Sequence, residues 1–118
     1  MGQSLTCLLV HIVFSTKHRA DLIPEPVEPD LYAYIGGICR SSGHVLLAAG
    51  GTSNHVHLLV SLSRNISISQ LMLEIKRDTS AWMKDKPGVS PAFYWQDGYG
   101  AFTIGASGVG AMRQYIAS

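Results

Sequence analysis

The stretch HVLLAAGGTSNHVHLLVSL, residues 44–62, contains two apolar runs separated by a short polar turn around Ser53–Asn54. Runs of this length on either side of turn residues predict an antiparallel β-hairpin. A lone hairpin is only marginally stable, so the elements that flank it decide the fold. The second run also places His55 and His57 on either side of Val56 in an otherwise apolar strand, which is costly unless the imidazoles have partners.

The flanking residues supply the remaining elements. A strand buried on both faces is predicted over residues 5–15, a proline-rich loop over 17–29, a helix capped by Asp30 over 30–41, a helix capped by Ser67 over 67–84, and a strand that bends near Gly98–Gly100 over 93–104. The 67–84 helix has the clearest apolar stripe: Ile68, Leu71, Met72, Ile75, Thr79 and Trp82. A glycine-rich tether over 104–111 then leads into a short C-terminal helix.

This order of elements, βαββαβ with an extra helix, predicts an α+β fold of the ferredoxin-like type. We expect an antiparallel sheet with helices on one face. The 118 residues are enough for one domain with its own core, and 47% of them are hydrophobic, which excludes a disordered chain.

Targeting signals and charge limit the location and the partners. The apolar run at 5–14 lacks a basic flank and a cleavage site, so we interpret it as a strand, and no stretch is long enough to span a membrane. Cys7 and Cys39 are expected to be buried, reduced thiols in a cytoplasmic protein. Residues 21–30 hold four of the eight acids and no base, so the rest of the chain is modestly basic and suits a polyanionic partner.

The histidine pair allows two interpretations. Residues two apart on a strand point to the same face, roughly 6.6 Å apart, so His55 and His57 can aim at one divalent ion, or they can be a semi-buried pair without a ligand. Two ligands do not complete a coordination sphere. His11 is the nearest candidate for a third if the first strand lies alongside, whereas His18 follows that strand and His44 opens the hairpin. The chain has no His-x-Thr or His-x-Ser motif, which disfavours two-histidine phosphoesterases.

Four motifs together identify a family. HIVFSTKHR (11–19), GGTSNHVHLLV (50–60), WQDGYGAFTI (95–104) and MRQYIAS (112–118) occur in the order and spacing of the insertion-sequence-200-like transposases, which the whole chain resembles. These are the single-tyrosine members of the HUH (His-hydrophobic-His) nucleases. The resemblance implies cleavage and rejoining of single-stranded DNA at hairpin ends of a mobile element, with Mg²⁺ or Mn²⁺ on His55 and His57. It also implies a 5′-phosphotyrosine intermediate, a prokaryotic host, and a homodimer in which one subunit's tyrosine completes the other's histidine site.

The nucleophile must be one of five tyrosines. On the C-terminal helix Tyr115 lies about 90° from the stripe formed by Val109, Met112 and Ile116, so its hydroxyl can leave the core. The family's nucleophile matches Tyr115, and packing roles are expected for Tyr34, Tyr94 and Tyr99. In the family a glutamine four residues after the tyrosine is the third metal ligand. That position falls just past Ser118, and Gln114 points to another side of the helix, so we expect a helix cut short or an incomplete metal site.

The DNA contacts and the alternatives complete the predictions. Phosphate contacts are expected from Lys17, His18 and Arg19 after the first strand and from Lys76 and Arg77 on the second helix. The leading interpretation is a metal-dependent DNA-strand transferase. A non-catalytic, ferredoxin-like module that binds single-stranded nucleic acid, such as a decayed transposase, is the alternative, and a metal-dependent hydrolase of small phosphoesters is a third.

Overall fold

The computed structural model describes residues 8–63 and 67–117. Its strands are β1 (Leu8–Ser15), β2 (Val45–Gly51), β3 (His55–Leu62) and β4 (Gly100–Ile104), and its helices are α1 (Glu28–Ser41), α2 (Ile68–Lys84) and α3 (Val109–Ala117). Short 3₁₀ turns cover Lys17–Arg19, Glu25–Val27 and Ala106–Gly108. The strands form one antiparallel sheet in the order β2-β3-β1-β4. The ferredoxin-like α+β fold is therefore confirmed.

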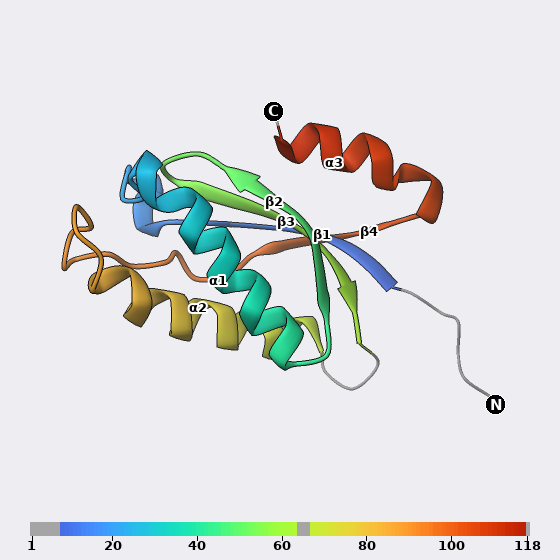
Figure 1. Ribbon diagram of the computed structural model, residues 1–118, viewed down its shortest axis with the longest axis horizontal. Helices are drawn as coiled ribbons and strands as arrows, with labels where there is room; N and C mark the ends of the chain where they lie inside the picture. The colour runs from blue at the N-terminus through green and yellow to red at the C-terminus, as the bar shows by residue number, and fades with distance from the viewer. Residues whose placement is uncertain (1–7, 64–66, 118) are drawn as a thin grey trace.

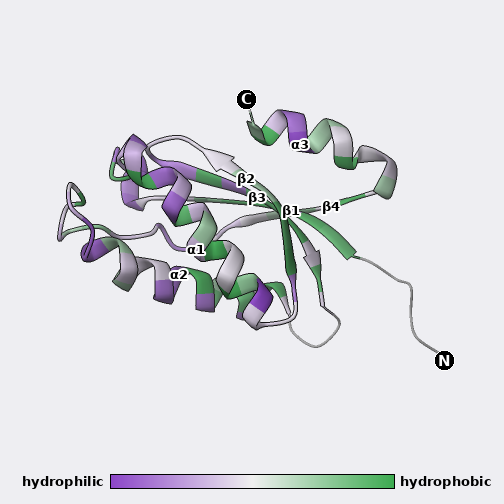
Figure 2. Ribbon diagram, viewed as in Figure 1, coloured by the Kyte–Doolittle hydropathy of each residue, from purple (hydrophilic) through white to green (hydrophobic). Residues whose placement is uncertain are grey.

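Different helices cover the two faces of the sheet. Helices α1 and α2 cover one face, and α3 lies on the other (Figure 1). The first face forms the main core, with Val10, Ile12 and Phe14 from β1 and alternate residues of β3 packed against both helices. Leu9 and His11, on the opposite face of β1, are also buried, whereas Leu8 is 46% exposed, so the prediction of a strand buried on both faces is confirmed only for the middle of β1. Figure 2 shows apolar residues at the N-terminal end of β1.

Three predicted boundaries were wrong. Helix α1 begins at Glu28, and Asp30 lies in its first turn instead of capping it, because Pro29 fits the first turn of a helix without losing a hydrogen bond. The last strand contains only Gly100–Ile104, and residues before it are irregular except for a bridge between Trp95 and Thr16. The expected tether is shorter, because a 3₁₀ turn follows Gly105 and α3 already begins at Val109.

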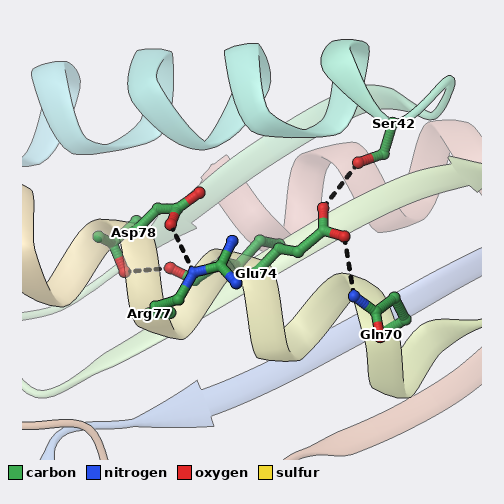
Figure 3. Close-up of polar contacts among 7 residues, drawn as sticks. Ser42, Gln70, Glu74, Arg77 and Asp78 are labelled. Carbon is green, nitrogen blue, oxygen red and sulfur yellow. Dashed lines mark hydrogen bonds and ion pairs between the residues drawn. The ribbon is translucent and has the colours of Figure 1, made fainter.

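The second helix is placed as the sequence predicts. Ser67 Oγ accepts the backbone N–H of Gln70 at 3.2 Å, which confirms the N-cap. Glu74 ties α2 to the end of α1, since its carboxylate accepts hydrogen bonds from Ser42 Oγ (2.8 Å) and Gln70 Nε2 (3.0 Å) (Figure 3). These two hydrogen bonds lower the pKa of Glu74.

Two further predictions concern the thiols and the membrane. Cys39 is a free, buried thiol, as predicted, while Cys7 and residues 5–6 of the predicted first strand lie outside the described residues. In the described ranges no helix has the length and apolar character needed to cross a bilayer.

Candidate active site

The histidine pair lies on the face of the sheet that α3 covers. Alternation along β3 directs Val56 and Leu58 into the main core, so His55 and His57 point the other way. The pairing of β1 with β3 puts His11 on the same face as both. His11 Nε2 lies 2.9 Å from His57 Nδ1, and the two rings are stacked with centroids 5.2 Å apart. Three histidines from two strands therefore form one cluster.

A chain of hydrogen bonds fixes the His55 ring. Its Nδ1 lies 2.9 Å from Asn54 Oδ1 and 2.9 Å from Thr52 Oγ1. Asn54 Nδ2 donates to the Asp21 carboxylate at 3.2 Å, which turns the amide oxygen of Asn54 toward His55. An amide oxygen only accepts, so His55 carries its proton on Nδ1. The lone pair on Nε2 is then free to bind a ligand.

The environment of His57 favours the neutral imidazole, because it lowers the pKa of the ring. Burial lowers its pKa, and the neighbouring His55 and His11 lower it further. Burial also lowers the pKa of His11. With Nδ1 of His57 engaged by His11, the Nε2 atom is the remaining nitrogen, and neutral imidazole is the form that binds metals.

The donor set fits an open, weakly held divalent ion. Two Nε2 atoms on one face of a strand, each ring oriented by a hydrogen bond through Nδ1, have the arrangement found around protein metal ligands. Across residues 8–63 and 67–117 no three His, Cys, Asp or Glu side chains converge to hold an ion. His11 is hydrogen-bonded to His57 instead of completing the set, and His44 is buried with its Nδ1 accepting the Ser63 N–H. Water and phosphate oxygens would have to fill the other positions.

Tyr115 lies over this cluster. Its ring meets His57 edge-on with centroids 5.6 Å apart and meets His11 at 6.0 Å. The side chain is 60% exposed, in agreement with its place off the apolar stripe of α3. A cavity of about 250 Å³ is lined by Gly51, Thr52, His55, His57, Tyr115 and Ile116. The structure thus brings together the three residues that the sequence singled out as nucleophile and metal ligands.

Gly50 on β2 allows α3 to lie close to the sheet. Gly50 pairs with His57 across β2 and β3. A Cβ atom at position 50 would overlap the carbonyl oxygen of Ile116 and lie 3.1 Å from its Cγ2. Ile116 is the buried residue of α3, so the helix rests on the sheet where the sheet has no side chain. Tyr115, one residue earlier, consequently lies at His57.

The other tyrosines divide into two groups. Tyr34 stacks on Trp82 with centroids 5.0 Å apart, and Tyr32 donates to Glu28 at 3.2 Å, so both belong to helix packing. The packing roles expected for Tyr94 and Tyr99 were wrong, because these side chains are 52% and 40% exposed in the irregular segment before β4.

The two predicted basic clusters meet at that irregular segment. The backbone N–H groups of Lys17 and His18 donate to Tyr94 O (2.9 Å) and Gln96 Oε1 (3.0 Å). Lys76 Nζ donates to the carbonyls of Gln96 (2.7 Å) and Gly98 (2.6 Å), so two of its three N–H bonds hold the segment in place. Burial lowers the pKa of this ammonium.

Within the described part of the chain, the remaining two cations, Arg19 and Arg77, do not hold the irregular segment. Arg19 lines a cavity that also includes His55, and it has a left-handed backbone with φ 55°. Arg77 pairs with the neighbouring Asp78 at 2.9 Å on the surface of α2. The roles of all five residues in DNA binding stay predictions.

Sequence reasoning missed several residues of this site. Asp21 and Asn54 orient His55, Thr52 contacts the same nitrogen, and Gly50 admits α3. Asn54 and Thr52 could have been suspected from their closeness to the histidines in the chain. Nothing in the sequence connects Asp21, in the acidic loop, with residues 33 positions later.

Two solved structures share this fold. A candidate transposase from Deinococcus radiodurans R1 superposes with a TM-score of 0.76 at 21% identity, covering 99% of this chain and 95% of that one. A REP-associated tyrosine transposase bound to a REP hairpin superposes with a TM-score of 0.68 at 15% identity, covering 98% of this chain and 70% of that one. At these identities the likeness establishes the fold alone, and no curated protein matches the sequence.

The sequence itself establishes the family. The family model described as "Transposase IS200 like" matches residues 4–118. The chain therefore belongs to the IS200-like transposase family, and the resemblance found in the four motifs is confirmed.

Proposed function

We propose that this protein cleaves and rejoins single-stranded DNA at the hairpin ends of a mobile element, with Tyr115 as the nucleophile and Mg²⁺ or Mn²⁺ bound by His55 and His57. The observation that supports the proposal is the single cavity lined by these three side chains. The neighbouring structure bound to a REP hairpin supports DNA hairpins as the partner.

The chemistry follows from the positions of the side chains. The Tyr115 hydroxyl attacks the scissile phosphorus, the Oη–P bond forms, and the bond from phosphorus to the 3′ oxygen breaks. The phenolic proton passes to water, since the side chain is 60% exposed, and the departing 3′ oxygen takes a proton from water. A second 3′-OH reverses the reaction and rejoins the strands without a nucleotide cofactor. A phenol is a weak nucleophile near neutral pH, and a divalent ion held by His55 and His57 would supply the charge that polarises the phosphate.

The test is covalent trapping. A labelled single-stranded hairpin incubated with the protein and Mn²⁺ should yield a protein–DNA adduct that survives denaturation. Tyr115→Phe should abolish the adduct, whereas Tyr34→Phe, a control in the helical layer, should keep it. His57→Ala should abolish cleavage and leave hairpin binding largely intact. Binding without any adduct in the wild type would favour the non-catalytic binding module instead.

The basic residues and the dimer are parts of the same proposal. Affinity for the hairpin should fall as salt rises, because binding cations release counterions from the DNA. A second copy of the chain could pack against either edge of the sheet, which β2 and β4 form. Phe102 on β4 is 57% exposed and adds an apolar contact there. In the single chain Tyr115 lies at its own His57, so a shared site requires α3 to move to the partner. Mixing His57→Ala with Tyr115→Phe protein tests this exchange, since only a shared site restores cleavage. The proposed setting is the cytoplasm of a prokaryote, at the nucleoid.

A further inference from the structure

A second cavity lies away from the histidine cluster, between α2 and the irregular segment of residues 94–99. Its volume is about 410 Å³, and its walls include Met72, Leu73 and Arg77 from the helix and Tyr94 and Tyr99 from the segment. The side chains of Leu73, Tyr94 and Tyr99 are 57%, 52% and 40% exposed. Two exposed aromatic rings and an exposed leucine in one hollow are a costly arrangement unless something covers them.

This cavity continues toward the active site. A neighbouring hollow of about 400 Å³ is lined by His55, Arg19 and Phe102, and it shares Asp97, Gly98 and Tyr99 with the α2 cavity. The two hollows adjoin at this shared wall, and we refer to them together as the groove. Cations accompany the groove: Arg19 lines one end, Arg77 lines the other, and the Lys17 ammonium lies 5.3 Å from the centre of the Tyr94 ring.

The walls of the groove are fixed before any ligand arrives. Trp95 is 4% exposed, and its indole N–H donates to Thr79 Oγ1 at 2.9 Å. Lys76 holds the carbonyls of Gln96 and Gly98 from the helix side. Preformed walls reduce the ordering cost of binding.

We infer that the α2 cavity binds an unpaired nucleobase of the DNA strand that flanks the scissile phosphate, with the base stacked on Tyr94 or Tyr99. This inference rests on the proposed function. Aromatic rings beside cations are how proteins hold single strands, because every base has a π-face and every nucleotide a phosphate. In the wall, the Asp97 carboxylate can accept a hydrogen bond from the edge of an unpaired base, and the Gln96 amide can donate one to it.

The test separates the flank from the hairpin. Binding is measured in a Tyr115→Phe background with two probes, a bare hairpin and the same hairpin carrying single-stranded flanks with 2-aminopurine placed at each flank position in turn. Protein with the wild-type cavity should bind the flanked probe more tightly than the bare hairpin, and it should quench the 2-aminopurine fluorescence at one flank position. Tyr94→Leu combined with Tyr99→Leu should weaken flanked-probe binding about 5- to 150-fold and abolish the quenching. The matching double Phe variant should retain both properties, and Tyr34→Leu, outside the groove, should change neither.

Bare-hairpin affinity should be equal in all variants, which shows that the proteins are folded and that the hairpin site is separate. Unchanged flanked-probe affinity and quenching in the double Leu variant would overturn the inference while leaving the proposed function intact. Loss of a dimer in that variant with no change in binding would instead make the cavity a contact between copies. Failure of the wild type to bind either probe would contradict the proposed function and this subsite with it.

Discussion

Replacement of Gly50 by alanine should release the tyrosine helix from the sheet. The new Cβ would overlap the carbonyl oxygen of Ile116, and a backbone atom cannot rotate away as a side-chain end can. Gly50 has no left-handed backbone that would itself penalise alanine. The variant therefore tests the close approach of α3 alone.

The size of the effect depends on the free energy with which α3 docks on the sheet. Ile116 is the buried residue in this nine-residue helix, and burial of an isoleucine side chain contributes about 1.5–3 kcal/mol. With that docking free energy, α3 is detached in roughly 1–10% of wild-type molecules. A clash that removes the docking makes the detached state dominant, and an isolated helix of this length does not stay folded in water.

Amide hydrogen exchange measures the effect directly. Amides of residues 109–117 should be protected about 10- to 100-fold in the wild type and lose that protection in Gly50→Ala, while the amides of β1 and β3 keep theirs. Gly110→Ala is the matched control, since nothing lies within 4 Å of its added Cβ and alanine favours the helix by about 1 kcal/mol. If Gly50→Ala kept α3 as protected as the wild type, the close packing at Ile116 would not be what positions Tyr115.

Three other predictions concern substitutions of single residues. Asn54→Ala removes the amide oxygen at His55 Nδ1, so Mn²⁺ affinity should fall about 10-fold, and ¹⁵N NMR of the metal-free protein should show His55 leaving the Nδ1–H tautomer. Burial raises the pKa of Cys39 to about 11, so between about pH 9 and 11 the folded state keeps a thiol proton that the unfolded chain loses. Cys39 should therefore lower the free energy of unfolding by about 1.4 kcal/mol per pH unit in this range, and the difference between wild type and Cys39→Ala in urea unfolding should show this contribution. Thr79→Val leaves the buried Trp95 indole N–H without its acceptor and should cost about 1–3 kcal/mol in urea unfolding, whereas Thr79→Ser should cost less.

The elements that local patterns encode were predictable. The hairpin, the Ser67 cap and the apolar stripe of α2 follow from periodicity and capping, which depend on residues close together in the chain. The histidine pair was found because two residues apart on a strand share a face. The angle of Tyr115 to a stripe of three residues predicted that its hydroxyl leaves the core, and its role as nucleophile came from the family resemblance.

What the sequence did not reveal depends on long-range contacts. The aromatic run at 93–99 predicts a strand, yet only Trp95 bridges to Thr16, and Lys76 holds the carbonyls of Gln96 and Gly98 that a sheet would otherwise use. The sequence therefore predicted a phosphate contact for Lys76 and did not reveal that its ammonium donates to two carbonyls of this loop. The partner of Asn54, Asp21, is unpredictable for the same reason, because its position depends on how the loop after β1 folds back over the hairpin.

Weak docking of α3 would reconcile the structure of the single chain with the shared active site that we propose. The glycine-rich tether expected from the sequence is mostly ordered, so chain flexibility alone does not free the tyrosine helix. The structure offers another route, because Ile116, the buried side chain of this helix, contributes only about 1.5–3 kcal/mol to its docking, beside the ring contacts of Tyr115 with His57 and His11. A partner surface that buries Ile116 equally well would make the two positions of Tyr115 close in free energy. Under the proposed function, cleavage in one position and rejoining in the other would then require little more driving force than the exchange of these contacts.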